Sequence, residues 1–221
     1  MPAGREVLWS PSEKRVENSR MAGYQRWLAS EKGIDTADFA SLWQWSISDL
    51  PTFWSSIWEH FEVISSAAPE STLDSPAMPG AHWFPGARLN WAENLLRHVD
   101  ADGPAIIAVR ENGTPREMSR PELVSQVANL AAHFRKMGVQ PGDRIAAVLP
   151  NIAPAVVAVL AAASVGAIWS CCAPDFGVKG LVDRFAQIEP TVLIGVDGYQ
   201  FNGKIVDREM SSPPCAPSSR R

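Results

Sequence analysis

The chain has 221 residues, enough for one sizeable domain or two small ones. Apolar residues make up 46 % of it, which predicts a packed core and excludes wholesale disorder. The net charge of −4 does not indicate a nucleic-acid partner, which would need a clustered basic face, and it is too small to predict a cationic partner.

The cysteines and the N-terminus bear on the location of the protein. Cys171, Cys172 and Cys215 have the spacing of neither a metal site nor a disulfide framework, so we expect free thiols in a reducing compartment. Residues 1–10 lack the apolar core of a signal peptide. The most apolar stretch, 152–169, contains proline and glycine and predicts a buried helix and strand, not a membrane span. We therefore expect a cytoplasmic protein.

Three helices are predicted in the first part of the chain. Ser10 is the expected N-cap of a helix that ends at Gly33. A second helix is predicted over 38–45, and a third begins near Asp49, where Pro51 suits the first turn. Apolar residues recur at helical spacing in this region, so we expect each helix to bury one face.

Tryptophans gather in the same region, since seven of the nine precede Phe84. Such a cluster has two interpretations. The first is a platform that binds a sugar or a membrane, and the second is a set of helices whose aromatic faces pack on a neighbouring domain. Helical spacing and the scarcity of flanking lysine and arginine favour packing. The next stretch, 67–86, is rich in proline and glycine and predicts a long irregular connection.

From residue 91 onward, helices and strands alternate. The expected helices are 91–98, a helix from a cap at Ser119 to Gly138, 153–165 and 178–187, and the expected strands are 105–109, a return strand ending at 118, 144–149, 167–172 and 191–196. A tight turn at Asn112 and Gly113 joins the first two strands. This order predicts right-handed crossovers and a mostly parallel sheet with both faces covered.

The predicted fold class is therefore α/β. An aromatic-rich helical N-terminal region over 1–100 is followed, over 101–207, by part of a mostly parallel βαβ sheet. Residues 208–221 are rich in proline, serine and arginine and predict a disordered tail. Because the last apolar strand has no following element to cover it, we expect an incomplete sheet.

Motifs that bind phosphates or carry catalysis by themselves are missing, including the P-loop, the dinucleotide fingerprint, the zinc-protease helix and the nucleophile elbow. The four histidines, of which His82 and His133 are examples, lie on different elements. We expect His82 to pack against its neighbours and not to act in catalysis, and we expect His133 on the surface of a helix. Asp175 either caps the following helix or faces a ligand. Lys204, after a glycine, either belongs to a turn or contacts a phosphate.

Several segments resemble one superfamily. Residues 138–146 resemble an early strand of the acyl-adenylate-forming enzymes, and residues 88–96 resemble a segment of their acetyl-CoA synthetase branch. Within that branch, residues 166–177 and 183–190 are similar to the acetoacetyl-CoA synthetases. The resemblance covers residues 7–207, and we expect the tail over 208–221 to lie outside the family pattern.

The resemblance implies a ligase that joins acetoacetate to CoA in two steps. ATP and the carboxylate give an acyl-adenylate and pyrophosphate, and the CoA thiol then displaces AMP to form the thioester. Mg²⁺ and a phosphate-cradling loop stabilise phosphate charge in such enzymes, and a mobile C-terminal domain delivers a lysine.

The family's phosphate loop, ribose-binding aspartate, hinge and catalytic lysine have no counterparts before residue 221, so no catalytic residue and no metal ligand is assigned. We expect an N-terminal fragment that is inactive alone. The resemblance does imply part of a CoA site, in which the loop of Ala173, Pro174, Asp175 and Phe176 lines the pantetheine tunnel. Lys204 would contact a phosphate of the CoA nucleotide.

Three interpretations remain open at the level of the sequence. The first is the inactive piece of a synthetase for acetoacetate or another short-chain acid. The second is a short protein that binds CoA, a nucleotide or a full-length synthetase. The third is an aromatic-rich interaction module without a ligand. Exchange of pyrophosphate into ATP with acetoacetate would identify an active enzyme, and titration with CoA would identify the second interpretation.

Overall fold

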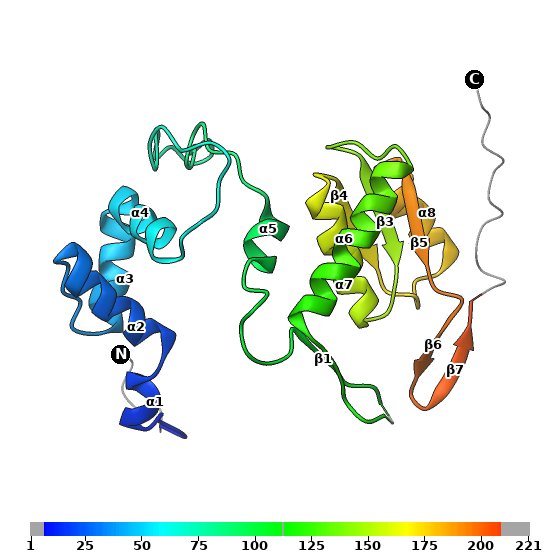
Figure 1. Ribbon diagram of the computed structural model, residues 1–221, viewed down its shortest axis with the longest axis horizontal. Helices are drawn as coiled ribbons and strands as arrows, with labels where there is room; N and C mark the ends of the chain where they lie inside the picture. Colours follow the sequence, from blue (N-terminus) through cyan, green and yellow to red (C-terminus); the bar gives the residue numbers. More distant parts are fainter. Residues whose placement is uncertain (1–6, 112, 209–221) are drawn as a thin grey trace. The chain divides into compact units, whose positions relative to one another are not determined.

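The computed structural model describes residues 7–111 and 113–208 (Figure 1). The predicted tail from residue 209 onward and Asn112 of the predicted turn lie outside these residues. The chain divides into two compact units, Met1–Leu89 and Asn90–Arg221. Each unit has a core of its own and is described by itself.

The first unit is helical. Its elements are α1 (Glu13–Glu17), α2 (Arg20–Trp27), the π-helix η1 (Leu28–Lys32), α3 (Phe39–Ser48) and α4 (Leu50–His60). The second and third predicted helices are confirmed as α3 and α4. Asp38 caps α3 in a reciprocal capping box with Ser41, and Asp49 caps α4, which has Pro51 in its first turn.

The single helix predicted from Ser10 to Gly33 is wrong in its start and its continuity. Ser12 is the N-cap, and its Oγ accepts a hydrogen bond from the Arg15 N–H at 3.4 Å. The helix stops after five residues because a second cap follows, in which Ser19 Oγ accepts from the Ala22 N–H at 3.1 Å. Gly33 does end the helical run, with φ of 65°.

The aromatic residues of this unit pack on one another. Tyr24, Leu28 and Leu42 form its buried centre, and the Tyr24 hydroxyl lies 2.6 Å from Ser56 Oγ. Trp45 and Phe53 meet edge to face with ring centroids 5.4 Å apart. These contacts confirm that apolar residues at helical spacing lie on the faces by which the helices of this unit pack on one another. Packing of the aromatic residues on a neighbouring domain stays a prediction.

A long irregular connection follows α4, as predicted. It is held by two isolated bridges, Ala67 with Arg88 and Leu73 with Trp83. The ring of Trp83 also lies against Trp54 of α4, with centroids 5.7 Å apart. The connection is therefore fixed to the first unit although it has no regular secondary structure.

The second unit contains the sheet. Its elements are α5 (Trp91–Leu96), β1 (Ile106–Ala108), β2 (Arg116–Met118), α6 (Arg120–Lys136), β3 (Arg144–Val148), α7 (Ala153–Ser164), β4 (Ile168–Cys172), α8 (Val178–Phe185), β5 (Val192–Gly195), β6 (Gly198–Phe201) and β7 (Lys204–Asp207). Strands β4, β3 and β5 form one parallel sheet in that order, which confirms the predicted α/β fold. The antiparallel hairpin of β6 and β7 was not predicted.

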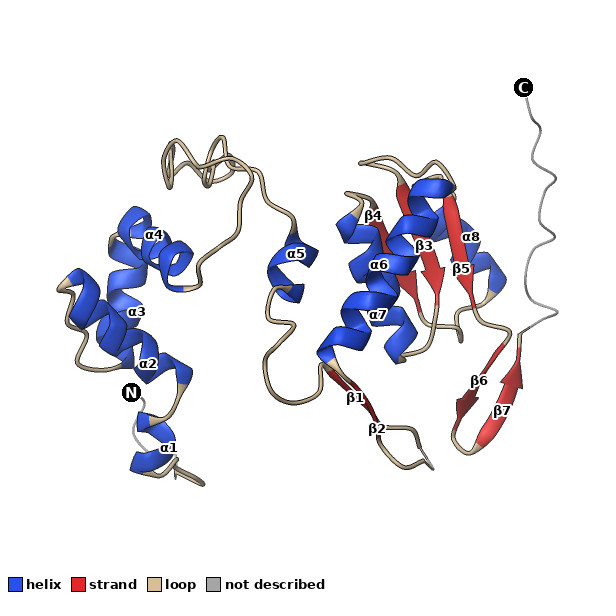
Figure 2. Cartoon of the chain, viewed as in Figure 1, coloured by secondary structure: helices blue, strands red, loops and turns tan. Residues whose placement is uncertain are grey.

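The two faces of the sheet are covered unequally (Figure 2). Residues of α6 and α7 bury one face around Ile145, which has no exposed surface, and α5 packs on α7. On the other face, Ala146 and Cys172 form a smaller cluster with Phe185 of α8, and Val148, Leu181 and Ile188 pack against it. Leu193 of β5 is 52 % exposed, so the prediction that apolar strands are covered on both faces is wrong for β5. No helix in the described ranges is long and apolar enough to span a membrane.

Candidate functional site

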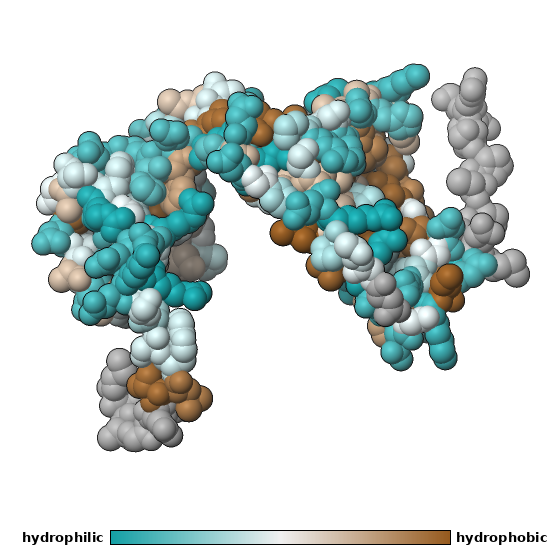
Figure 3. Space-filling view, turned by 60° about the horizontal axis from the view of Figure 1, so that its bottom comes forward, coloured by the Kyte–Doolittle hydropathy of each residue, from teal (hydrophilic) through white to brown (hydrophobic). Residues whose placement is uncertain are grey.

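A hollow of about 530 Å³ lies on the α8 face of the sheet and follows β5, from Pro190 before the strand to Val196 after it. The end of β3, strand β5, helix α8 and the loop between β4 and α8 line it. Loops at the carboxyl ends of parallel strands are the usual ligand-binding positions in open α/β sheets. Apolar side chains dominate the lining, and Figure 3 shows apolar surface gathered on this unit.

The loop predicted to contact CoA reaches this hollow with two of its four residues. Pro174 is buried and Phe176 is 39 % exposed, and both line the hollow. The Phe176 N–H donates to the Ala173 carbonyl at 3.3 Å, which closes a turn. The Arg184 guanidinium of α8 lies 5.2 Å from the centre of the Phe176 ring, a cation–π contact that fixes the ring beside the hollow.

Asp175 does not cap the helix, so that interpretation is wrong. The N-cap of α8 is Gly177, and no side chain bonds to the helix start there. The reason is local, because the turn closed by Ala173 and Phe176 leaves Asp175 on its exposed side. Its role toward a ligand stays a prediction.

Lys204 begins β7 and does not line the hollow. It follows a two-residue turn, in which Asn202 and Gly203 both have positive φ, of 50° and 73°. Asn-Gly with this geometry is the preferred turn of a tight hairpin, and this signal in the sequence was missed. The turn presents the exposed Lys204 beside a pair of backbone N–H groups.

Those two N–H groups are bound by a carboxylate from far along the chain. Glu111 accepts from the Asn202 N–H at 2.7 Å and from the Gly203 N–H at 2.8 Å. The hydrogen bond from the Gly203 N–H and the weaker effect of the one from the Asn202 N–H stabilise the charged carboxylate, and they lower the pKa of Glu111. No local signal predicts this contact, because 91 residues separate Glu111 from Asn202.

Arg208 is a further cation of the site, and the sequence did not indicate it. It lines the hollow, and its guanidinium lies 5.6 Å from the centre of the Tyr199 ring. Its Nη2 donates to the Tyr199 hydroxyl at 3.4 Å, whereas its Nε is buried without a hydrogen-bond partner in the described part of the chain. Buried polar atoms usually have a hydrogen-bond partner, and this nitrogen has none among the described residues.

The histidines do not contribute to this site. His82 lies in the first unit, with 71 % of its side chain exposed and Nδ1 3.0 Å from the Asp74 carboxylate, so the prediction that it packs is wrong. Its loop neighbour Trp83 takes the packing position against Trp54 instead. His133 is exposed on α6, as predicted.

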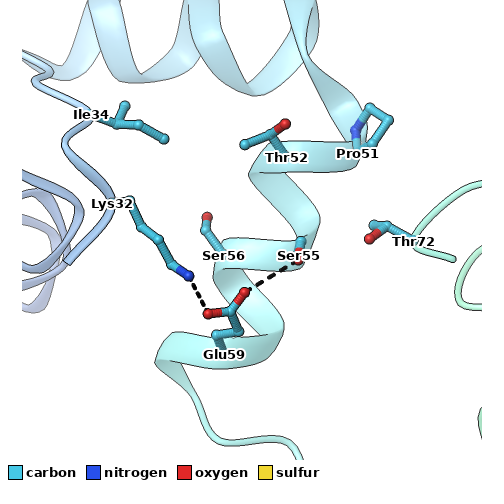
Figure 4. A pocket seen from close by; sticks show the side chains of 8 residues that line it. All are labelled: Lys32, Ile34, Pro51, Thr52, Ser55, Ser56, Glu59 and Thr72. Carbon is cyan, nitrogen blue, oxygen red and sulfur yellow. Dashed lines mark hydrogen bonds and ion pairs between the residues drawn. The ribbon is translucent and has the colours of Figure 1, made fainter. Parts of the chain in front are cut away.

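A smaller hollow of about 290 Å³ lies in the first unit (Figure 4). Its one lysine, Lys32, forms an ion pair with Glu59, and Ser55 Oγ donates to the same carboxylate at 3.4 Å. Because the charges are already paired, this hollow offers no free cation to an anionic ligand. Across residues 7–111 and 113–208, no group of His, Cys, Asp or Glu is arranged to hold a metal ion.

A parallel α/β sheet with ligand loops at its carboxyl edge defines a broad class of nucleotide- and cofactor-binding proteins. Family comparison identifies the member of this class. A family model described as "AMP-binding enzyme" matches residues 96–218, more than half of the chain, and a model described as "Acetyl-coenzyme A synthetase N-terminus" matches residues 39–95. The chain belongs to the AMP-binding enzyme family.

Individual relatives agree with the family models. An acetoacetyl-coenzyme A synthetase of Rhizobium meliloti is 42 % identical over 200 residues, which are 90 % of this chain and 31 % of the relative. A malonamoyl-CoA synthetase of Penicillium aethiopicum is 35 % identical over 92 % of this chain and 29 % of its own length. The solved acetoacetyl-CoA synthetase of Streptomyces lividans superposes with a TM-score of 0.88 at 45 % identity, covering 94 % of this chain and 32 % of that one.

These comparisons confirm the resemblance to acetoacetyl-CoA synthetases. The chain spans about a third of the length of the relatives it matches. The family match runs past residue 207, into the residues that were expected to form a tail. The two segment boundaries expected from the sequence, after residues 100 and 207, stay predictions.

Proposed function

We propose that this chain forms the N-terminal part of an acid–thiol ligase that joins acetoacetate to CoA. In the first step the acetoacetate carboxylate attacks the α-phosphate of ATP, and pyrophosphate leaves. In the second step the CoA thiolate attacks the acyl carbon of the adenylate, and AMP leaves. The observation that supports this proposal best is the 45 % identity to a solved acetoacetyl-CoA synthetase along 94 % of the chain.

The proposal assigns this chain a binding role and leaves the chemistry to residues outside it. The loop of Ala173, Pro174, Asp175 and Phe176 borders the path of the pantetheine arm, and its apolar ring and proline suit that uncharged chain. Lys204, exposed at the hairpin, attracts a phosphate of the CoA nucleotide. The Arg208 guanidinium already contacts the ring and the hydroxyl of Tyr199, so we do not assign it a phosphate of CoA.

A cytoplasmic location and inactivity of the isolated chain are parts of the same proposal. The free thiols of Cys171 and Cys172 fit a reducing compartment. A different short-chain acid is the second candidate substrate, and the similarity to a malonamoyl-CoA synthetase favours it.

A chimera tests the proposal directly. Residues 7–208 of this chain replace the matching part of the Streptomyces lividans synthetase, and thioester formation is measured with ATP, CoA and acetoacetate. Activity supports the proposal. A folded chimera without activity would refute it. The isolated chain is expected to give no ATP–pyrophosphate exchange.

A further inference from the structure

The β6–β7 hairpin carries Lys204, which the proposed function assigns to a phosphate of the CoA nucleotide, yet this hairpin is separate from the parallel sheet. In the described residues its two strands pair only with each other. Two of its apolar side chains, Phe201 and Ile205, are 66 % and 87 % exposed, so their burial contributes little to its position. A two-stranded hairpin by itself is marginally stable in water. The position of Lys204 therefore depends on contacts between the hairpin and the rest of the unit.

Glu111 makes such a contact at the two residues directly before Lys204. One oxygen of its carboxylate accepts from the Asn202 N–H at 2.7 Å, and the other accepts from the Gly203 N–H at 2.8 Å. Hydrogen bonds to a charged acceptor are stronger than those between neutral groups. A turn whose two N–H groups are held in this way has little freedom to move, and the backbone of the residue that follows it is restrained as well.

Glu111 is itself connected to the hydrophobic core. It lies in the segment that joins β1 to β2, two strands that pair antiparallel. Ile106 of β1 and Met118 of β2 pack against the core cluster of the second unit. The described contacts thus run from the core through the β1–β2 pair to Glu111, and from Glu111 to the turn beside Lys204.

We propose that Glu111 is a positioning residue for CoA, which fixes the β6–β7 turn so that Lys204 meets a phosphate of the nucleotide. The inference rests on the proposed function, because it uses the assignment of Lys204 to the CoA site. Glu111 acts through the turn and does not itself touch CoA. It reduces the ordering that the hairpin would otherwise undergo when CoA binds, and pre-organisation of this kind raises affinity.

The same two N–H groups have a competing role, in which they hold the phosphate themselves. Adjacent N–H groups in a turn with positive φ form a site for an anion, and in that role Glu111 would obstruct CoA. The Glu111 carboxylate is tethered within the same chain, so a phosphate from solution has to displace an acceptor that is already in place. We therefore expect the phosphate to bind Lys204 while Glu111 keeps the turn.

The chimera of the preceding subsection tests the proposal through the KM for two thiol substrates. Glu111→Ala should raise the KM for CoA about threefold at unchanged kcat, because the turn then has to be ordered when CoA binds. The KM for pantetheine, which has the thiol arm of CoA and none of its phosphates, should stay unchanged. Glu117→Ala is the matched control, since Glu117 is an exposed glutamate of β2, and it should change neither KM.

A double-mutant cycle shows whether Glu111 acts through Lys204. In a chimera that carries Lys204→Ala, the further change Glu111→Ala should leave the KM for CoA as it is, because the side chain that the turn positions is already absent. Two independent contributions would instead multiply. Loss of coupling between the two positions would show that Glu111 acts on the protein in another way, and it would overturn the proposal.

The remaining outcomes of the single substitution also decide the matter. An unchanged KM for CoA in Glu111→Ala, or an equal rise for CoA and pantetheine, would overturn the positioning role. A lower KM for CoA would identify the two N–H groups as the phosphate site and Glu111 as an obstruction to it.

Failure of the proposed function gives a different result, because the unsubstituted chimera then forms no thioester from acetoacetate. Titration calorimetry of the folded chimera with CoA and with pantetheine replaces the KM values in that case. A weaker dissociation constant for CoA alone in Glu111→Ala would support the positioning role without any turnover. Absence of CoA binding by the folded, unsubstituted chimera would overturn both proposals.

Discussion

The Glu111 carboxylate accepts a hydrogen bond from the Gly203 N–H at 2.8 Å, and this bond fastens the β6–β7 turn to the segment that follows β1. The neighbouring Asn202 N–H donates to the other oxygen of the same carboxylate at 2.7 Å. Both donors lie in a turn with positive φ, so adjacent N–H groups point to the same side and form a site for an anion. Glu111 supplies that anion from within the chain.

Glu111→Ala should therefore loosen the hairpin without unfolding the sheet. Amide hydrogen exchange at Asn202 and Gly203 should become several-fold faster, because both N–H groups lose their acceptor. Exchange in β3 should stay unchanged, since this strand is held by β4 and β5. Glu117→Ala is the control, because Glu117 is exposed on β2 and should leave the turn protected. Faster exchange throughout the unit would contradict a local role.

The pKa of Glu111 predicts how this contact depends on pH. Hydrogen bonds from Gly203 and Asn202 lower the pKa below the ordinary value of 4.5, so the folded state holds the carboxylate charged more strongly than the unfolded state does. The contribution to stability is thus present above pH 4.5 and is lost as the pH falls through the lowered pKa. The amide shift of Gly203, followed by NMR, should titrate with a midpoint below 4.5. A midpoint at or above 4.5 would contradict the contact.

Local patterns in the sequence were sufficient to predict where most helices and strands lie. Ser119 caps α6 as predicted, with its Oγ accepting from the Glu122 N–H at 3.2 Å, and α6 is followed by Gly138 in the left-handed conformation. The Glu122 carboxylate, one turn into the helix, accepts from the Gln126 side chain at 3.1 Å. The cap residue therefore predicted the start of this helix.

Contacts between residues far apart in the sequence could not be predicted from local sequence patterns. The apolar run of β5 predicts burial on both faces, which is wrong, whereas the expectation that no element covers this last strand agrees with the 52 % exposure of Leu193. The contact of Glu111 with Gly203 joins residues 92 positions apart, and no local rule selects that pair. The Asn202–Gly203 turn could have been predicted, because the Asn-Gly pair is a local sequence signal for a tight hairpin.

The core of the sheet predicts a large loss of stability on truncation. Ile145 of β3 has no exposed surface and lies between α6, α7 and the neighbouring strands. Ile145→Ala should lower the free energy of unfolding of the second unit by about 2–5 kcal/mol, and Ile145→Val by about 1 kcal/mol. Urea unfolding measures both values. Ile107→Ala is the matched control, since Ile107 is 58 % exposed, and it should cost less than Ile145→Val does. Equal losses for the two alanine variants would show that the sheet is not the core.

Lys204 provides the sharpest test of the proposed CoA site. It is exposed on β7, so a charge contact with a phosphate there is worth about 1 kcal/mol, or about fivefold in affinity. In the active chimera, Lys204→Ala should raise the KM for CoA about fivefold at unchanged kcat, Lys204→Arg should keep most of the affinity, and higher salt should shrink the difference. Lys179→Ala, which removes an exposed lysine of α8, is the control and should change neither constant. An unchanged KM for Lys204→Ala would remove Lys204 from the site, whereas a fall in kcat alone would place it in the chemical step.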